Sequence, residues 1–199
     1  MTDADTPSRW QNRRIVLAAV VFVAAAVLST LTLLAVRWVA GPDASAAHRG
    51  GGTGLGFVRL DKPARPLSLP DLRGHGTMTL ATLAGKPIVL NFWSSTCAPC
   101  NQETPAVASV ARTVGGKVRF VGIDSADLRN HAIAFVARYK VPYQIGFDPH
   151  GAIADRYGVP GLPVTFFLSS SGKTVLGENI GALTSHKLRV ILHRLYGVS

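Results

Sequence analysis

The two cysteines of the chain, Cys97 and Cys100, are the residues whose type and spacing point most directly to chemistry. They stand in the order Cys-Ala-Pro-Cys, and the 199 residues contain no third cysteine. Two thiols this close can form a disulfide with each other, and a thiolate can attack a disulfide in another molecule. The alternatives are a structural disulfide or half of a metal site, but a structural zinc site takes four protein ligands and there is no second cysteine pair. The spacing therefore favours a redox-active dithiol.

The cysteine pair lies between a predicted strand and a predicted helix. Ile88 to Trp93 is an unbroken apolar run, typical of a strand buried on both faces, and Ala98 to Val114 has helical character. The N-terminus of a helix carries free N–H groups and a partial positive charge, which stabilise a thiolate. We therefore expect Cys97, at that terminus, to be the nucleophile and Cys100, one turn further on, to be the resolving thiol.

Strands and helices alternate along the rest of the globular part. The predicted strands are Val58–Leu60, Leu67–Leu69, Lys117–Asp124, Val141–Phe147, Val164–Leu168 and Thr174–Leu176. The predicted helices are a short turn at Thr79–Leu83, one capped by Asp127, one over Gly151–Tyr157 and one over Ser185–Tyr196. This order predicts an α/β fold in which helices cover both faces of a mixed central sheet.

The N-terminal part predicts a membrane anchor. Residues 15–36 contain no charged residue and are long enough, as a helix, to cross about 30 Å of hydrocarbon. Arg9, Arg13 and Arg14 precede this run, which favours a cytoplasmic N-terminus. A signal peptide cleaved at Ala44-Ser45-Ala46 is the alternative, although the apolar run is longer than such peptides use. Both interpretations place the globular part outside the cytoplasm.

These observations divide the chain into four parts. We expect a cytoplasmic segment 1–14, a transmembrane anchor 15–36, a glycine-rich flexible linker 37–56 and a globular domain 57–199. The formal net charge is +10, yet no run of five Lys or Arg and no nucleic-acid motif occurs. The basic surface suits solubility or an anionic membrane, so we expect no nucleic-acid partner.

Several segments together resemble a known superfamily. They are LSLPDLRG, KPIVLNFW, CAPCNQETP, VGID, YGVPGLPVTFFLSSSGK and the last helix, in order between Pro66 and Tyr196. The chain is in this respect similar to the thioredoxin superfamily and, more narrowly, to membrane-anchored extracytoplasmic thiol–disulfide oxidoreductases of the ResA and TlpA type. The resemblance implies a thioredoxin-like fold and a dithiol–disulfide cycle that needs no cofactor.

The resemblance also implies a substrate-binding segment opposite the cysteines. Thioredoxin-like folds place a cis proline there, and Pro163 in Gly161-Leu162-Pro163 matches that position. A proline lacks an N–H, and the backbone of Leu162 would then pair with an extended substrate. The alternatives are an ordinary trans turn proline or Pro160 as the cis residue.

A proton-handling carboxylate is implied as well. Glu103 stands three residues after Cys100 and, as in ResA-like proteins, would take the Cys100 proton. A solvent-exposed helix glutamate is the alternative. Asn91 replaces the buried Asp of soluble thioredoxins and cannot act as a base, which shifts proton handling toward Glu103. Thr96 replaces the Trp that usually precedes the first cysteine, so the docking surface differs.

The direction of the reaction and the partners follow from the same resemblance. Pro99 is shared with reducing thioredoxins, which favours a reductant. An exported reductant needs electrons from across the membrane, which implies a membrane thiol donor of the CcdA or DsbD type. The clients would be disulfides of exported proteins, with apocytochrome c as one of them.

Two other functions are open at this point. A peroxiredoxin-like peroxidase uses Pro-x-x-x-Thr-x-x-Cys, whereas Leu90 and Ser94 occupy those two positions here. A copper chaperone of the Sco kind spaces its cysteines CxxxC and adds a histidine; His131 and His150 are lone histidines. Neither pattern fits as well as the dithiol, so a thiol–disulfide oxidoreductase is the leading hypothesis.

Overall fold

The computed structural model describes residues 56–198 together with Ala25 and Ser29. Apart from those two residues, the predicted cytoplasmic segment 1–14 and transmembrane anchor 15–36 lie outside the described residues, as does the linker up to residue 55. Among the described residues there is no helix long and apolar enough to cross a bilayer. Gly56 already belongs to the folded part, because its carbonyl accepts a hydrogen bond from the N–H of Ile180.

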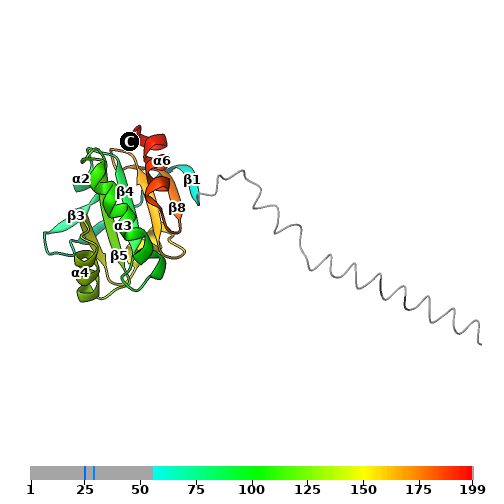
Figure 1. The fold of residues 1–199 in the computed structure, drawn as a ribbon, viewed down its shortest axis with the longest axis horizontal. Coiled ribbons are helices and arrows are strands. Elements are labelled where there is room, and N and C mark those ends of the chain that lie inside the picture. Colours follow the sequence, from blue (N-terminus) through cyan, green and yellow to red (C-terminus); the bar gives the residue numbers. More distant parts are fainter. Residues whose placement is uncertain (1–24, 26–28, 30–55, 199) are drawn as a thin grey trace, which may run out of the picture. The chain divides into compact units, whose positions relative to one another are not determined.

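A mixed sheet of six strands forms the centre of residues 56–198 (Figure 1). In spatial order the strands are β1 (Phe57–Pro63), β8 (Thr174–Ile180), β7 (Val164–Leu168), β4 (Ile88–Trp93), β5 (Arg119–Ser125) and β6 (Gln144–Asp148). The neighbours β4–β5 and β5–β6 are parallel, whereas β4–β7, β7–β8 and β8–β1 are antiparallel. The predicted mixed sheet is therefore confirmed, and β4 lies inside it.

Helices cover both faces of this sheet. In the described domain they are α2 (Leu80–Leu83), α3 (Ala98–Thr113), α4 (Arg129–Arg138), α5 (Ala152–Tyr157) and α6 (Ser185–Tyr196). α3 and α6 lie side by side on one face (Figure 1), where Val107 and Leu188 belong to one apolar cluster with Val89 of β4. On the other face, Tyr157 of α5 packs against Phe92, with ring centroids 5.4 Å apart. Because both faces are covered, all six residues of β4 are buried.

A small hairpin protects the outer edge of the sheet at β6. Its strands are β2 (Ser68–Pro70) and β3 (Thr77–Thr79). Just after β2, Asp71 bridges to Gly146, and the N–H of Leu72 donates to the carbonyl of Ile145 at 2.8 Å. An edge strand with free N–H and C=O groups can pair with other chains, and this segment occupies part of that edge.

The strand predicted at Val141–Phe147 begins three residues later than expected. The reason is the end of α4: Lys140 has a φ of 49°, in the left-handed region, and the N–H of Val141 donates back to the carbonyl of Val136 at 3.1 Å. This six-to-one bond closes the helix and keeps Val141 out of the sheet ladder. The preceding predicted strand, Lys117–Asp124, is similarly shifted and spans Arg119–Ser125.

A glycine in β5, Gly122, allows close packing between the side chains of Trp93 and Ile145. A Cβ on Gly122 would lie 2.6 Å from Nε1 of Trp93 and 2.6 Å from Cδ1 of Ile145. We expect Gly122→Ala to lower the free energy of unfolding by about 1–3 kcal/mol, because the indole and the isoleucine have to move apart. The shift of the urea midpoint at unchanged slope measures this loss.

Gly161→Ala is the matched control. A Cβ at Gly161 meets no atom within 4 Å, and this glycine does not have a positive φ. We therefore expect its stability to stay within about 0.5 kcal/mol of the parent. Equal stability of the two variants would contradict the packing argument.

Candidate active site

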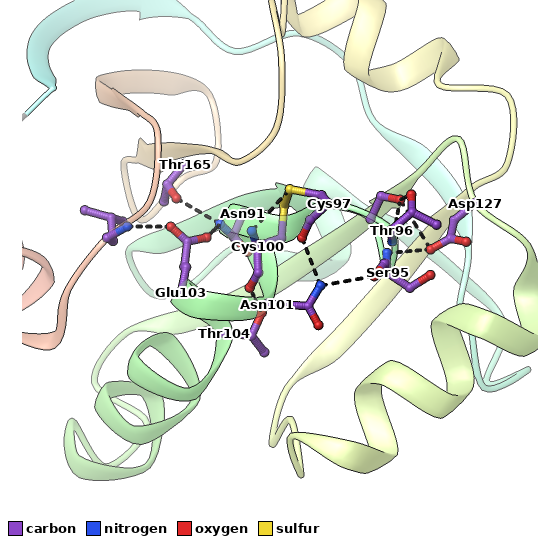
Figure 2. Close-up of a disulfide and its surroundings, with 12 residues drawn as sticks. Asn91, Ser95, Thr96, Cys97, Cys100, Asn101, Glu103, Thr104, Asp127 and Thr165 are labelled. Atoms are coloured by element: carbon purple, nitrogen blue, oxygen red, sulfur yellow. Dashed lines mark hydrogen bonds between the residues drawn. A yellow bond between two sulfur atoms is a disulfide. The ribbon is translucent and has the colours of Figure 1, made fainter.

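Cys97 and Cys100 form a disulfide at the start of α3 (Figure 2), with an S–S bond of 2.02 Å. Cys97 is the N-cap of the helix, and its Sγ accepts a hydrogen bond from the N–H of Cys100 at 3.2 Å. Pro99 fits the first turn, since an N–H there would have no helical partner. Cys97 is half-buried, whereas Cys100 has no exposed surface. An incoming sulfur therefore reaches Cys97 before Cys100.

The turn from Ser94 to Thr96 leads from β4 to the disulfide, and α3 holds it from one side. The side-chain amide of Asn101 donates to the carbonyls of Ser95 (3.2 Å) and Cys97 (2.9 Å). Tyr139, at the end of α4, donates its O–H to Oδ1 of Asn101 at 2.9 Å. The backbone around Cys97 is thereby fixed to two helices.

Asp127 holds the same turn from the other side (Figure 2). Its Oδ2 accepts the N–H of Ser95 at 2.6 Å, and its Oδ1 accepts the N–H of Leu128 at 2.7 Å. Burial by itself raises the pKa of Asp127, but the hydrogen bonds from Ser95 and Leu128 outweigh it and keep this pKa below its usual range. The prediction that Asp127 caps a helix is wrong: the N-cap of α4 is Leu128, which makes no side-chain cap bond.

Glu103 lies on α3 and points into the protein, not into solvent (Figure 2). Its side chain accepts two hydrogen bonds of 2.7 Å, from Nδ2 of Asn91 to Oε1 and from the N–H of Leu183 to Oε2. The residue is 1% exposed, so the alternative of a surface glutamate is wrong. Burial raises the pKa of Glu103 to about 7, although the bonds from Leu183 and Asn91 partly oppose the shift.

The sheet register brings Asn91 to Glu103. Asn91 of β4 lies directly opposite Thr165 of β7, and its Nδ2 also donates to Oγ1 of Thr165 at 3.0 Å. Side chains three residues apart share one side of a helix, so Glu103 follows Cys100 on the same side of α3. Asn91 cannot take a proton, and its hydrogen bond orients the ionisable side chain of Glu103.

The peptide bond between Leu162 and Pro163 is cis, as predicted. Pro163 is buried, and its carbonyl accepts the N–H of Gly181 at 2.9 Å. Leu162 is half-buried just before β7, and it packs against the apolar cluster that contains Cys100 and Trp93. Cys97 packs against that same cluster. Leu162 and Cys97 therefore pack against the same apolar cluster, while the role of Leu162 in binding stays a prediction.

Sequence reasoning missed two residues that hold the site and gave a third another role. Asn101 binds the Ser95 and Cys97 carbonyls, and Tyr139 binds Asn101. Asp127 was predicted as a helix cap, whereas it accepts the N–H of Ser95. Asn101 carried a signal, since an Asn one position after a CxxC can bond back to the preceding turn. Trp93, at the end of β4, serves as scaffold: it is buried, and its ring stacks on Phe135 with centroids 4.5 Å apart.

The chain has named relatives. It is 37% identical over 115 residues to a thiol:disulfide interchange protein DsbE of Allochromatium vinosum, a match that covers 57% of this chain and 62% of that protein. It is 29% identical over 139 residues to the thiol-disulfide oxidoreductase ResA of Bacillus thuringiensis, covering 69% of this chain and 79% of the relative. The first match thus spans less than two thirds of the relative's length. The predicted resemblance to ResA-type proteins is confirmed.

Structural comparison agrees with the sequence. The crystal structure of a DsbF homologue from Corynebacterium diphtheriae superposes with a TM-score of 0.64 at 26% identity, covering 74% of this chain and 96% of that one. The predicted thioredoxin-like α/β fold is therefore confirmed. A sequence profile of the AhpC/TSA family matches residues 60–175, more than half of the chain. With its mixed sheet and its Cys97–Cys100 disulfide at a helix N-terminus, the chain belongs to the AhpC/TSA family of thioredoxin-like proteins.

Proposed function

We propose that the chain is a membrane-anchored thiol–disulfide oxidoreductase that reduces disulfides of exported proteins. The observation that carries this proposal is the disulfide between half-buried Cys97 and fully buried Cys100 at the N-terminus of α3. The relatives named as thiol:disulfide interchange proteins support the same chemistry.

The cycle begins with the reduced dithiol. The Cys97 thiolate attacks one sulfur of a client disulfide; that bond breaks, the other client sulfur leaves as a thiolate, and a mixed disulfide forms. The Cys100 thiolate then attacks Sγ of Cys97 and releases the second client sulfur. The client gains two electrons, and the protein ends in the disulfide form seen here. A thiol donor returns the two electrons for the next round.

Glu103 is the proposed base for the second attack. Cys100 is fully buried, so its proton has no direct route to water. A carboxyl group whose pKa is raised to about 7 can accept that proton and release it again near neutral pH. The hydrogen bonds from Asn91 and Leu183 hold the carboxylate in place for this transfer.

Leu162 and Pro163 form the proposed client-binding segment. Leu162 lies just outside the ladder of β7 and packs against the cluster that Cys97 also contacts. An extended client segment that pairs with the Leu162 backbone would bring its disulfide to Cys97. Exposed Thr96, in the place of a tryptophan, makes this docking surface more polar.

The cellular setting completes the proposal. Residues 15–36 anchor the chain, the N-terminus stays in the cytoplasm, and the domain acts outside it. A membrane thiol donor of the CcdA or DsbD type supplies electrons, and apocytochrome c is one client. A peroxidase is disfavoured because Leu90 and Ser94 stand where the peroxidase pattern has Pro and Thr.

The cysteines are tested by serine substitution. Cys97→Ser is expected to reduce insulin disulfides only at the uncatalysed rate, because the attacking thiolate is gone. Cys100→Ser is expected to accumulate mixed disulfides on Cys97, which non-reducing gels and mass spectrometry detect. Normal turnover by Cys97→Ser would refute the proposed function. Peroxide consumption that survives Cys100→Ser would instead establish a peroxidase.

Glu103 is tested by its effect on the second step. In wild type, release of the second client thiol in a single turnover is expected to speed up as pH rises through about 7, because the ionised carboxylate is the base. Glu103→Gln is expected to slow that step about 100-fold and to remove this dependence. Stopped-flow detection of the released thiol measures both.

Glu178→Gln is the control for the kinetic test. It makes the same change at a partly exposed residue paired with Lys62, and it should leave the release of the second client thiol unaltered.

The pH dependence of stability is an independent test of the Glu103 pKa. The folded pKa of Glu103 lies above its unfolded value of 4.5, so its stabilising contribution is complete below pH 4.5 and is lost as pH rises to about 7. That loss amounts to about 3 kcal/mol and should be missing from Glu103→Gln. Identical pH profiles for wild type and Glu103→Gln would exclude the role.

The anchor is tested by fractionation. The full chain is expected to stay with membranes after alkaline carbonate washing, and a chain lacking residues 1–36 is expected to be released, because the apolar run alone holds it. Release of the full chain would contradict the anchor. A mature N-terminus just after Ala46 would establish the cleaved signal peptide in its place.

A further inference from the structure

Asp124, the second-last residue of β5, carries a carboxyl group without a protein donor. Its side chain has no exposed surface, and neither of its oxygens accepts a hydrogen bond from a donor in residues 56–198. It lies directly opposite Trp93, the last residue of β4 before the turn that leads to Cys97. A buried, ionised and unpaired carboxylate is costly, so the group needs another explanation.

The charged groups that face Asp124 come from three places. They are Asp127 in the loop after β5, Asp148 at the end of β6 and Arg129 on α4. Asp148 is engaged elsewhere, since its Oδ2 accepts the N–H groups of Ile153 and Ala154. Asp127 is the group that remains as a hydrogen-bond partner for Asp124.

Arg129 offsets only part of the negative charge: it lowers the pKa of Asp124, but less than burial and the charge of Asp127 raise it. Its guanidinium donates to the carbonyl of Leu72, and it lies over the ring of Phe147 at 4.3 Å. Two neighbouring carboxyl groups with little compensating positive charge do not both ionise, because each charge disfavours the other. One proton is then held between them, and it belongs to the pair as a whole.

The preferred site of that proton follows from the surroundings. Burial, followed by the charge of Asp127, raises the pKa of Asp124 to about 8. Asp127 is the better place for the negative charge, because it already accepts the N–H groups of Ser95 and Leu128. Asp124 as the neutral acid has an O–H to donate, and this explains why it lacks a protein donor of its own.

We propose that Asp124 stays protonated at neutral pH and donates its O–H to Asp127, and that this shared proton makes the two residues a positioning pair for the Ser94–Thr96 turn that carries Cys97. The proposal rests on the function proposed above for Cys97. Loss of the proton places two negative charges in contact inside the protein. Repulsion then moves Asp127 away from Ser95 (Figure 2), and the turn loses its support on that side.

The consequence is that the reactivity of Cys97 falls, instead of rising, at alkaline pH. A thiol becomes more reactive with rising pH, as more thiolate forms, and then levels off. The N–H of Cys97 donates to the carbonyl of Ser94 at 3.2 Å, so movement of the turn moves the cysteine. Above the titration of Asp124, the reactivity of Cys97 therefore falls, which thiol ionisation alone cannot produce.

The protonation of Asp124 is tested first, by carbon-13 NMR of the purified full chain with carbon-13 in the aspartate side-chain carboxyl groups. One aspartate signal is expected to titrate near pH 8 and to be missing in Asp124→Asn. In Asp127→Asn that signal should titrate at lower pH, because the neighbouring charge is gone. Asp155→Asn, the same change at an exposed residue of α5, should leave it in place. If no aspartate of the wild-type chain titrates above pH 6, the proposal is overturned, even if a variant fails to fold.

The link to Cys97 is tested by alkylation of the reduced chain. In wild type the rate is expected to fall about 5-fold between pH 7.5 and pH 9.5, while Asp124→Asn, which keeps an N–H donor toward Asp127 but cannot ionise, shows no fall. Superimposable profiles for wild type and Asp124→Asn would overturn the positioning role. Both experiments need no client protein, so a chain that fails to reduce insulin but shows these titrations would refute only the proposed function.

Discussion

The burial of the Glu103 carboxyl group is the constraint on which the rest of the site depends. A carboxylate removed from water has to be hydrogen-bonded, and this one receives an amide from β4 and a backbone N–H from the segment before α6. One side chain thus connects the helix that carries Cys100 to the central strand and to the segment just before the last helix. Any displacement of α3 would break these bonds, so the position of the disulfide is tied to the core.

Two buried acidic groups with raised pKa values lie in the elements near the Ser94–Thr96 turn. Glu103 lies on α3, and Asp124 lies at the end of β5 beside Asp127. Burial is the main cause of both raised pKa values, about 7 and about 8. Because folding raises these pKa values, each group contributes stability that is complete in acid and declines as pH rises toward neutrality or beyond.

Local patterns were enough to predict most of the fold. The unbroken apolar run of β4 and the residues of α3, β7 and α6 were predicted to within a residue, because burial on both faces and helix signals are visible in the chain. The start of β6 was missed, because a left-handed Lys140 extends the helix ending at the expense of the strand. Asp127 was assigned to the wrong partner for a similar reason: its cap position was visible, whereas Ser95 lies 32 residues away.

By itself the sequence determined that Cys97 and Cys100 form a close pair between a strand and a helix, because their spacing and the elements around them depend on neighbouring residues alone. It also indicated Pro163 and Glu103 through the resemblance. Only the tertiary structure decided that Glu103 is buried and bonded to Asn91, and that the carboxyl group of Asp124 is buried without a protein donor. Burial and hydrogen bonds depend on distances between segments remote in the chain, and those distances are set by how the sheet and helices pack.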